Sequence, residues 1–154
     1  MKAVVMALRQ LYRRQQASDG GADRRRVKLA LGQGAFYLMT GVWPLVSLRT
    51  FERVTGPKTD RWLVKTVGVL VTVIGMVLLV AGRRRRVSDE VVQLAVGSAA
   101  GLASIDTIYR LRGRIATVYL LDALVELVLI GGWLRAGWRH APRSRGRALA
   151  RFGQ

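Results

Sequence analysis

Three acidic side chains lie in apolar surroundings in the second half of the chain. Asp106 follows the uncharged stretch 91–105, and Asp122 and Glu126 are the only charges in the stretch 115–134. A carboxyl group near the centre of a bilayer costs on the order of 3 kcal/mol, and such groups mark proton or ion pathways when they face a helix bundle. Asp106, Asp122 and Glu126 are therefore the candidate ion or proton site.

The spacing of these acids predicts that they lie close together. Asp122 and Glu126 are four residues apart, which places them on one face of a helix. If a hairpin turns at Gly113, a rise of about 1.5 Å per residue puts Asp106 about 10 Å and Asp122 about 13 Å from the turn. Glu126 would lie deeper, about 20 Å from the turn. We expect a shared acidic strip that opens to the extracytoplasmic side.

Buried acids can be accommodated by pairing or by protonation. Arg110 follows Asp106 by one helical turn and can bridge it near the membrane interface. The pairing candidates are Arg110, Lys65, Arg61, Tyr37, Thr40 and Tyr119. Desolvation and neighbouring like charges both favour the neutral form of a carboxyl group, so we expect at least one of Asp122 and Glu126 to be neutral at pH 7. Three kinds of site fit this pattern: one that only fastens helices, one that moves protons or cations, and a polar pocket for a small lipophilic ligand such as a quinone or a lipid headgroup.

Several kinds of chemistry have no residues to carry them. The sequence has no cysteine, and its one histidine, His140, lies in the basic C-terminal segment. This excludes disulfides, thiol redox chemistry and iron–sulfur ligation, and it excludes a haem or metal held by imidazole within a bilayer. The sequence also has no nucleotide-binding loop and no pairing of a nucleophile with a base. We therefore predict a protein that is not an enzyme and that has no metal and no cofactor.

Four long apolar stretches of the sequence are predicted to form the helices that position the acids. Crossing a hydrocarbon core of about 30 Å takes roughly 20 helical residues. The predicted fold is all-α, a polytopic membrane protein with a bundle of four transmembrane helices in a domain spanning 29–134. The third span is the least secure, because it reaches spanning length only if its helix continues through Asp106. The predicted spans are 29–48, 64–82, 89–111 and 115–134.

The distribution of basic residues predicts the orientation. With four spans, eighteen of the 26 Lys and Arg residues fall on the side of the two termini and eight on the other side. Under the positive-inside rule this places both termini in the cytoplasm. A composition rich in Arg, Ala, Val and Gly is typical of a bacterial genome of high GC content. The predicted location is therefore a bacterial inner membrane.

The two ends of the chain are basic. Residues 2–16 place apolar side chains on one side and arginines on the other, which predicts a helix lying on anionic lipid headgroups. The sequence "ASDGGAD" at 17–23 predicts a flexible linker that completes an N-terminal segment 1–28. The segment 135–154 is predicted to be a disordered cytoplasmic tail. Binding of nucleic acid is disfavoured, because arginines that flank a span already serve orientation and lipid contact.

Small residues predict close helix packing in the third span. Gly97 and Gly101 form a GxxxG pair, a pattern that lets another helix approach closely. Ala95, Ala99 and Ala103 fall on the side of Asp106, roughly opposite Gly97. With small residues on both sides, this span is predicted to be the central helix of the bundle.

The organisation of the chain resembles that of small DoxX-like four-helix membrane proteins. The resemblance covers about residues 29–134 and rests on four short spans, cytoplasmic termini, a tight last hairpin and the kinked "GVWPLVSLRTFERVTGP" segment. It implies a four-helix fold and an accessory role, since some members of that group are linked to quinone-dependent oxidation as accessory subunits. It transfers no catalytic residue, and the lack of cysteine argues against a thiol-based role.

Three functions remain open at the level of sequence. The leading hypothesis is an accessory or structural membrane protein that associates with itself or with a larger membrane complex. The first alternative is a small proton-coupled transporter or ion-conducting oligomer that uses Asp106, Asp122 and Glu126. The second alternative is a quinone-linked redox accessory subunit. In every case the bilayer, with its anionic headgroups, is an expected partner.

Overall fold

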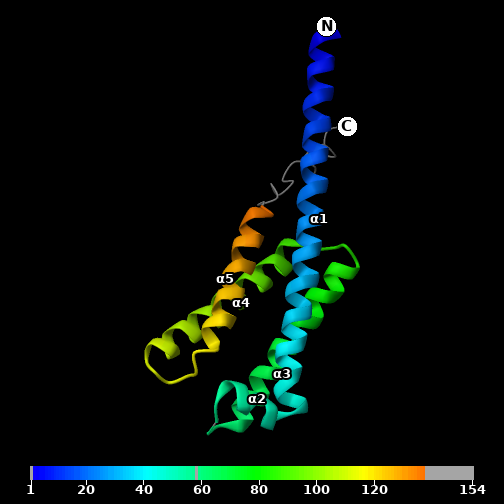
Figure 1. Ribbon diagram of the computed structural model, residues 1–154. Coiled ribbons are helices and arrows are strands. Elements are labelled where there is room, and N and C mark those ends of the chain that lie inside the picture. Colours follow the sequence, from blue (N-terminus) through cyan, green and yellow to red (C-terminus); the bar gives the residue numbers. More distant parts are fainter. Residues whose placement is uncertain (1, 58, 138–154) are drawn as a thin grey trace, which may run out of the picture.

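The chain folds into helices that run up and down beside one another (Figure 1). The computed structural model describes residues 2–57 and 59–137, and the regular elements there are all α-helices. The N-terminal part of the first helix extends beyond the ends of the others. The helices are α1 (Lys2–Val46), α2 (Leu48–Thr55), α3 (Arg61–Arg83), α4 (Asp89–Leu111) and α5 (Tyr119–Arg135).

Three of these helices are long and apolar enough to cross a membrane: Asp23–Val46 in α1, Arg61–Arg83 and Asp89–Leu111. This confirms an all-α chain compatible with a membrane. The least secure of the predicted spans, 89–111, has the bounds of α4. Helix α5 has 17 residues, which is the lower limit for a span.

Helix α5 begins four residues later than the sequence indicated. Residues 115–118 are not helical, and the helix starts at Tyr119. Gly113 adopts a φ of 66° after the end of α4, a left-handed conformation that glycine adopts without steric cost. The residues after Gly113 form the connection between α4 and α5. Ile115 and Val118 in this connection have weak helix propensity, so they do not extend α5 toward its N-terminus. The predicted start of the fourth helix at 115 was therefore wrong.

The predicted linker at 17–23 is also absent, because α1 is helical without a break from Lys2 to Val46. Each glycine in a helix interior costs about 1 kcal/mol relative to alanine, and this segment has only Gly20 and Gly21 and no proline. Extending an existing helix avoids the cost of nucleation. The predicted lipid-facing side chains of 2–16 and the predicted tail beyond residue 137 lie outside what the structure describes.

Helices α1 and α3 pack through glycines that face one another. A Cβ atom added to Gly34 would lie 2.9 Å from the carbonyl oxygen of Gly75, and one added to Gly41 would lie 2.8 Å from that of Gly68. Both pairs are spaced by seven residues on antiparallel helices. Side chains at these positions would hold the two backbones apart. Helix α1 makes most of its contacts with α3.

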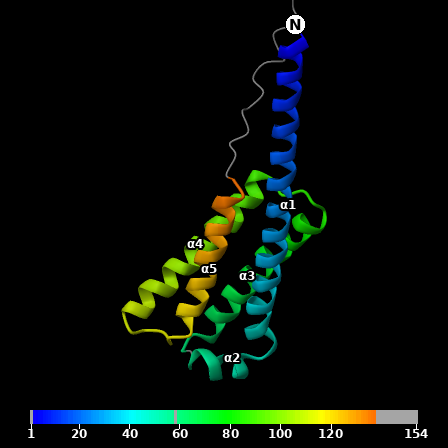
Figure 2. The same cartoon turned by 45° about the horizontal axis from the view of Figure 1, so that its top comes forward.

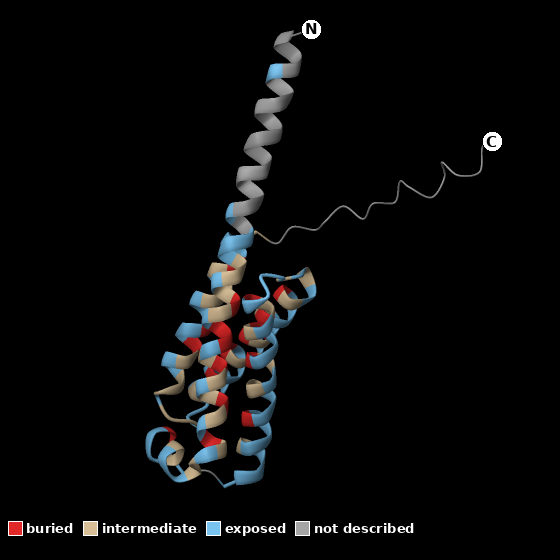
Figure 3. Cartoon of the chain, turned by 90° about the vertical axis from the view of Figure 1, so that its right-hand side faces the viewer, coloured by how far each residue is buried: buried red, intermediate tan, exposed pale blue. Residues whose placement is uncertain are grey.

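Helices α4 and α5 form a second antiparallel pair, which makes few contacts with the α1–α3 pair (Figure 2). The buried residues lie along the contacts between the helices, while much of the outer surface is exposed (Figure 3). This exposed surface is apolar; Leu70 on α3 is 58% exposed and Leu124 on α5 is 57% exposed. The core cluster consists of Ala30, Tyr37, Leu78, Val92, Ala95 and Trp133.

Candidate functional site: a buried acidic cluster

Glu126 lies on α5 at the junction with α1. Its side chain is fully buried, and its Oε2 atom accepts a hydrogen bond of 3.0 Å from the hydroxyl group of Tyr37, which is also fully buried. Its Oε1 atom is buried and has no hydrogen-bond partner among the described residues. One oxygen of this carboxyl group is therefore held by a phenol on α1, and the other is left without a donor.

Asp106 and Asp122 bring α4 and α5 together. Asp106 is 6% exposed, and its carboxyl group lies close enough to that of the half-buried Asp122 for the two to interact. Two ionised carboxylates offer only acceptors, so a hydrogen bond between them would need one proton. The Oδ2 atom of Asp106 is buried and has no partner in the described part of the chain. The predicted proximity of Asp106 and Asp122 on adjacent helices agrees with this geometry.

A chain of buried polar groups continues from Glu126. Trp133 on α5 donates from Nε1 to Oε1 of Gln33 on α1 at 2.7 Å, and Gln33 donates from Nε2 to the carbonyl oxygen of Ala95 on α4 at 2.9 Å. The side chains of Gln33 and Ser98 also lie near the hydroxyl group of Tyr37. We call these groups, from Trp133 through Gln33, Ser98 and Tyr37 to Glu126, the polar chain. It joins three helices.

Gln33 and Ser98 were not among the residues that the sequence analysis singled out. Gln33 is the one amide side chain in the uncharged stretch 29–48, and a lone polar side chain in a span usually faces a polar partner. That signal could have identified it. Ser98 had no such signal, because serine is common in spans, where its hydroxyl group bonds to the helix backbone. Here it bonds to the carbonyl oxygen of Ala95 at 3.1 Å.

The predicted charge partners do not neutralise the acids. Arg110 makes no ion pair with Asp106, and its buried Nε atom has no partner in the described chain. Lys65 is exposed on α3 and makes no ion pair with the three acids. The acidic side chain of Asp106 instead shares the buried face of Ala99 and Ala103. Residues four apart share one face of a helix, yet the groups that act on the carboxyl group of Asp106 are Asp122 and Glu126 on α5.

The hydroxyl-bearing candidates differ from one another. Tyr37 contacts Glu126 as described. Thr40 donates to the carbonyl oxygen of Phe36 in its own helix at 3.0 Å, so it does not reach the acids; hydroxyl groups in helices commonly bond one turn back. Tyr119 is half-buried at the start of α5.

Gly97 and Gly101 do not mediate packing within the chain. Both are exposed, and no atom lies within 4 Å of a Cβ built at either position. The prediction that α4 is the central helix was therefore wrong. Its Ala95, Ala99 and Ala103 face is buried, whereas the opposite, glycine-bearing face is open. The close backbone contacts of this fold occur between α1 and α3.

The acidic cluster, Asp106 with Asp122 and Glu126, thus combines three carboxyl groups, a phenol and no paired cation. Among the described residues no group of three or more histidine, cysteine, aspartate or glutamate side chains is arranged to hold a metal ion. The chemistry available to carboxyl and phenol groups in contact is the binding, sharing and release of protons.

Comparisons with protein-family models, with curated protein sequences and with solved structures give no match to this chain. The resemblance to DoxX-like proteins therefore stays a prediction.

Proposed function

We propose that this protein is a multi-pass membrane protein that binds and releases a proton at the acidic cluster, as a small proton-coupled transporter or proton-conducting oligomer. Glu126 is the deep proton-binding group, and Tyr37 orients it. Asp106 and Asp122 form the second part of the site and exchange a proton between α4 and α5.

The observation that carries this proposal is the unpartnered oxygen of the fully buried Glu126. A buried ionised carboxylate is stable only when charges or donors surround it. Tyr37 supplies one donor, and no described cation supplies the compensating charge. A carboxyl group built only to fasten helices would have both oxygens satisfied, since an unsatisfied buried polar atom costs about 1 to 3 kcal/mol.

The proposal includes four membrane crossings in a bacterial inner membrane, with both termini in the cytoplasm. Support comes from Arg26 near the start of the α1 span. It pairs with Asp89 at the start of α4, at 3.0 Å, and donates to the carbonyl oxygen of Gly137 just beyond α5, at 2.6 Å. The end of α5 thus returns to the end of the bundle where α4 begins. Reporter fusions at the two termini test this, because three crossings would place the termini on opposite sides.

Proton flux into vesicles tests the function directly. The purified full-length chain is reconstituted in vesicles that contain a pH-sensitive dye, and a potassium diffusion potential drives proton entry. We expect the parent protein to raise the rate of acidification above that of empty vesicles, and Glu126→Gln to abolish the increase. Glutamine keeps the shape and the hydrogen bond of the side chain but cannot exchange a proton.

The matched control is Glu90→Gln, because Glu90 is an exposed acid at the start of α4 and lies outside the cluster. This variant should conduct like the parent. A parent protein with the flux of empty vesicles, or a Glu126→Gln variant with the flux of the parent, would overturn proton conduction.

Infrared spectroscopy tests proton binding without requiring transport. The C=O stretch of a protonated carboxylic acid is separate from the bands of ionised carboxylates. At neutral pH we expect such a band in the parent protein and a loss of part of its intensity in Asp106→Asn, which removes one member of the acid pair. A spectrum in which the parent has no such band would contradict a shared proton.

A second candidate function, an accessory protein that associates with itself or with a larger membrane partner, is favoured by one observation. The GxxxG face of α4 lies open on the outside of the described chain, with space around both glycines. Such a face permits close approach of a helix from another chain. Crosslinking in native membranes tests this; a crosslinked species should weaken when Gly97 and Gly101 are both replaced by leucine.

A further inference from the structure

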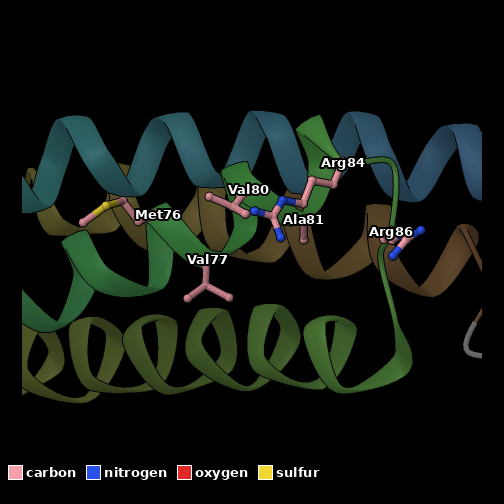
Figure 4. A pocket seen from close by; sticks show the side chains of 6 residues that line it. All are labelled: Met76, Val77, Val80, Ala81, Arg84 and Arg86. Carbon is pink, nitrogen blue, oxygen red and sulfur yellow. The ribbon is translucent and has the colours of Figure 1, made fainter.

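A groove runs along the outer side of α3 beside α4 (Figure 4). It has a volume of about 420 Å³. Four apolar residues line most of it, and two arginines line one end. The guanidinium group of Arg84 bends back along the groove toward Val80. The residues that line it are Met76, Val77, Val80, Ala81, Arg84 and Arg86.

The arginine end of the groove adjoins a second hollow of about 330 Å³. Arg86 lines both, and the second hollow adds Arg26, Arg85 and the acid Asp23. Arg26 is engaged with Asp89 at 3.0 Å. Arg84, Arg85 and Arg86 are exposed, and they form no ion pair with any residue of the described chain. The end of the groove therefore carries uncompensated positive charge.

Two arginines at the opposite end of the bundle have partners within the chain. Arg61 pairs with Glu52 at 3.2 Å, and the guanidinium group of Arg112 lies over the ring of Tyr109, 6.0 Å from its centroid. Those cations are occupied by groups of the chain itself. The groove, by contrast, ends in unpaired arginines, and this end of the bundle is the one where α3 is joined to α4.

We propose that this groove is a binding site for an anionic phospholipid. One acyl chain lies along Met76, Val77 and Val80, and the phosphate group sits at the arginine end, where the side chains of Arg84 and Arg86 can reach it. Arginine suits this role because its planar guanidinium group donates two parallel hydrogen bonds to phosphate oxygens. Basic pockets between spans on the cytoplasmic side are characteristic of sites for anionic headgroups. This proposal does not depend on proton binding by the acidic cluster.

Native mass spectrometry of the purified full-length protein tests the proposal. Phosphatidylglycerol and phosphatidylcholine with identical acyl chains are the probes. We expect the parent to retain one phosphatidylglycerol molecule in preference to phosphatidylcholine. Replacing Arg84 and Arg86 together by alanine should weaken the retention of phosphatidylglycerol roughly thirtyfold. The matched control removes the same charge at the opposite end, by replacing Arg112 and Arg114 with alanine, and should retain the lipid like the parent.

If both double variants lost phosphatidylglycerol retention equally, the proposed site would be wrong, because the lipid would then be attracted by net charge alone. A second variant guards against misinsertion after loss of arginines: Ala81→Phe keeps every charge but fills the groove, and it should also weaken retention. Retention of phosphatidylglycerol by Ala81→Phe at the level of the parent would overturn the acyl-chain part. Displacement of the lipid by equimolar glycerol phosphate would overturn a lipid site in favour of a phosphate site.

Discussion

The α1–α3 pair and the junction of α4 and α5 with α1 are held together in opposite ways. In the first, glycines at 34, 41, 68 and 75 bring two backbones into direct contact. In the second, the polar chain and the acidic cluster make the contacts. The glycine contacts of the first interface include no carboxyl group, and the second contains three.

This difference separates a rigid part of the molecule from a part that can respond. Close backbone packing admits few alternative arrangements, since any added atom meets the neighbouring helix. A polar junction depends on which groups carry protons, because donors become acceptors when a carboxyl group ionises. The proposed function would use a fixed α1–α3 pair with an α4–α5 pair beside it whose contacts change on protonation.

The largest effect is expected at the glycine interface. Replacing Gly34 and Gly41 together by alanine places Cβ atoms within 3.0 Å of the backbone of α3, so the helices must separate. We expect a loss of about 4 kcal/mol in the free energy of unfolding, since each overpacked site costs about 1 to 3 kcal/mol. Unfolding by a denaturing detergent, followed by tryptophan fluorescence, measures it. A loss below 1 kcal/mol would mean that the close contact does not exist.

The next effect is expected in the polar chain. Gln33→Leu leaves Nε1 of Trp133 without its acceptor and removes one of the two side-chain donors to the carbonyl oxygen of Ala95, which should cost about 2 kcal/mol. The same detergent titration measures it. Gln93→Leu is the matched control, because Gln93 is exposed on α4; its free energy of unfolding should not fall. If the two substitutions had equal effects, the buried hydrogen bonds of Gln33 would contribute nothing.

A smaller coupling is expected between Tyr37 and Glu126. A double-mutant cycle with Tyr37→Phe and Glu126→Gln isolates the hydrogen bond of 3.0 Å, and we expect an interaction free energy of about 1 kcal/mol. Purely additive losses in stability would show that the two side chains do not interact. Thr40→Val serves as the control partner, because Thr40 bonds only within its own helix.

The smallest effect is expected at the open face of α4. Replacing Gly97 and Gly101 together by alanine matches the α1 double variant in chemistry, but the added atoms meet nothing within 4 Å. The stability of the monomer in detergent should stay the same or rise by up to about 1 kcal/mol per site from helix propensity. A loss like that of the α1 variant would place this face in an interface with another copy of the chain.

The sequence predicted most of the helical fold because hydrophobic length and helix bounds are local properties. The predicted span 89–111 matches α4, and 64–82 lies within α3. The errors came where local signals compete. Glycines at 20 and 21 suggested a break, yet α1 continues, because two glycines cost less than ending and restarting a helix.

The site was predicted in part. Helical spacing and the hairpin position were enough to bring Asp106 near Asp122 and to turn Glu126 inward. The partners of the acids were not predicted well. The i, i+4 spacing within α4 favoured Arg110 as the partner of Asp106, whereas in the structure Asp106 lies beside Asp122 of α5. The prediction of which glycines mediate helix packing was also wrong. The GxxxG pair at 97 and 101 is exposed, and the glycines spaced by seven residues in α1 and α3 make the close contact.

By itself the sequence determined the all-α class, the apolar lengths, the charge asymmetry and the presence of acids within apolar stretches, because each follows from composition and local periodicity. Only the tertiary structure decided that Tyr37 donates to Glu126, that Gln33 joins Trp133 to Ala95, and that unpaired arginines close a groove on α3. Those contacts join residues 62 to 100 positions apart. Their formation depends on helix rotation and pairing, which no local pattern specifies.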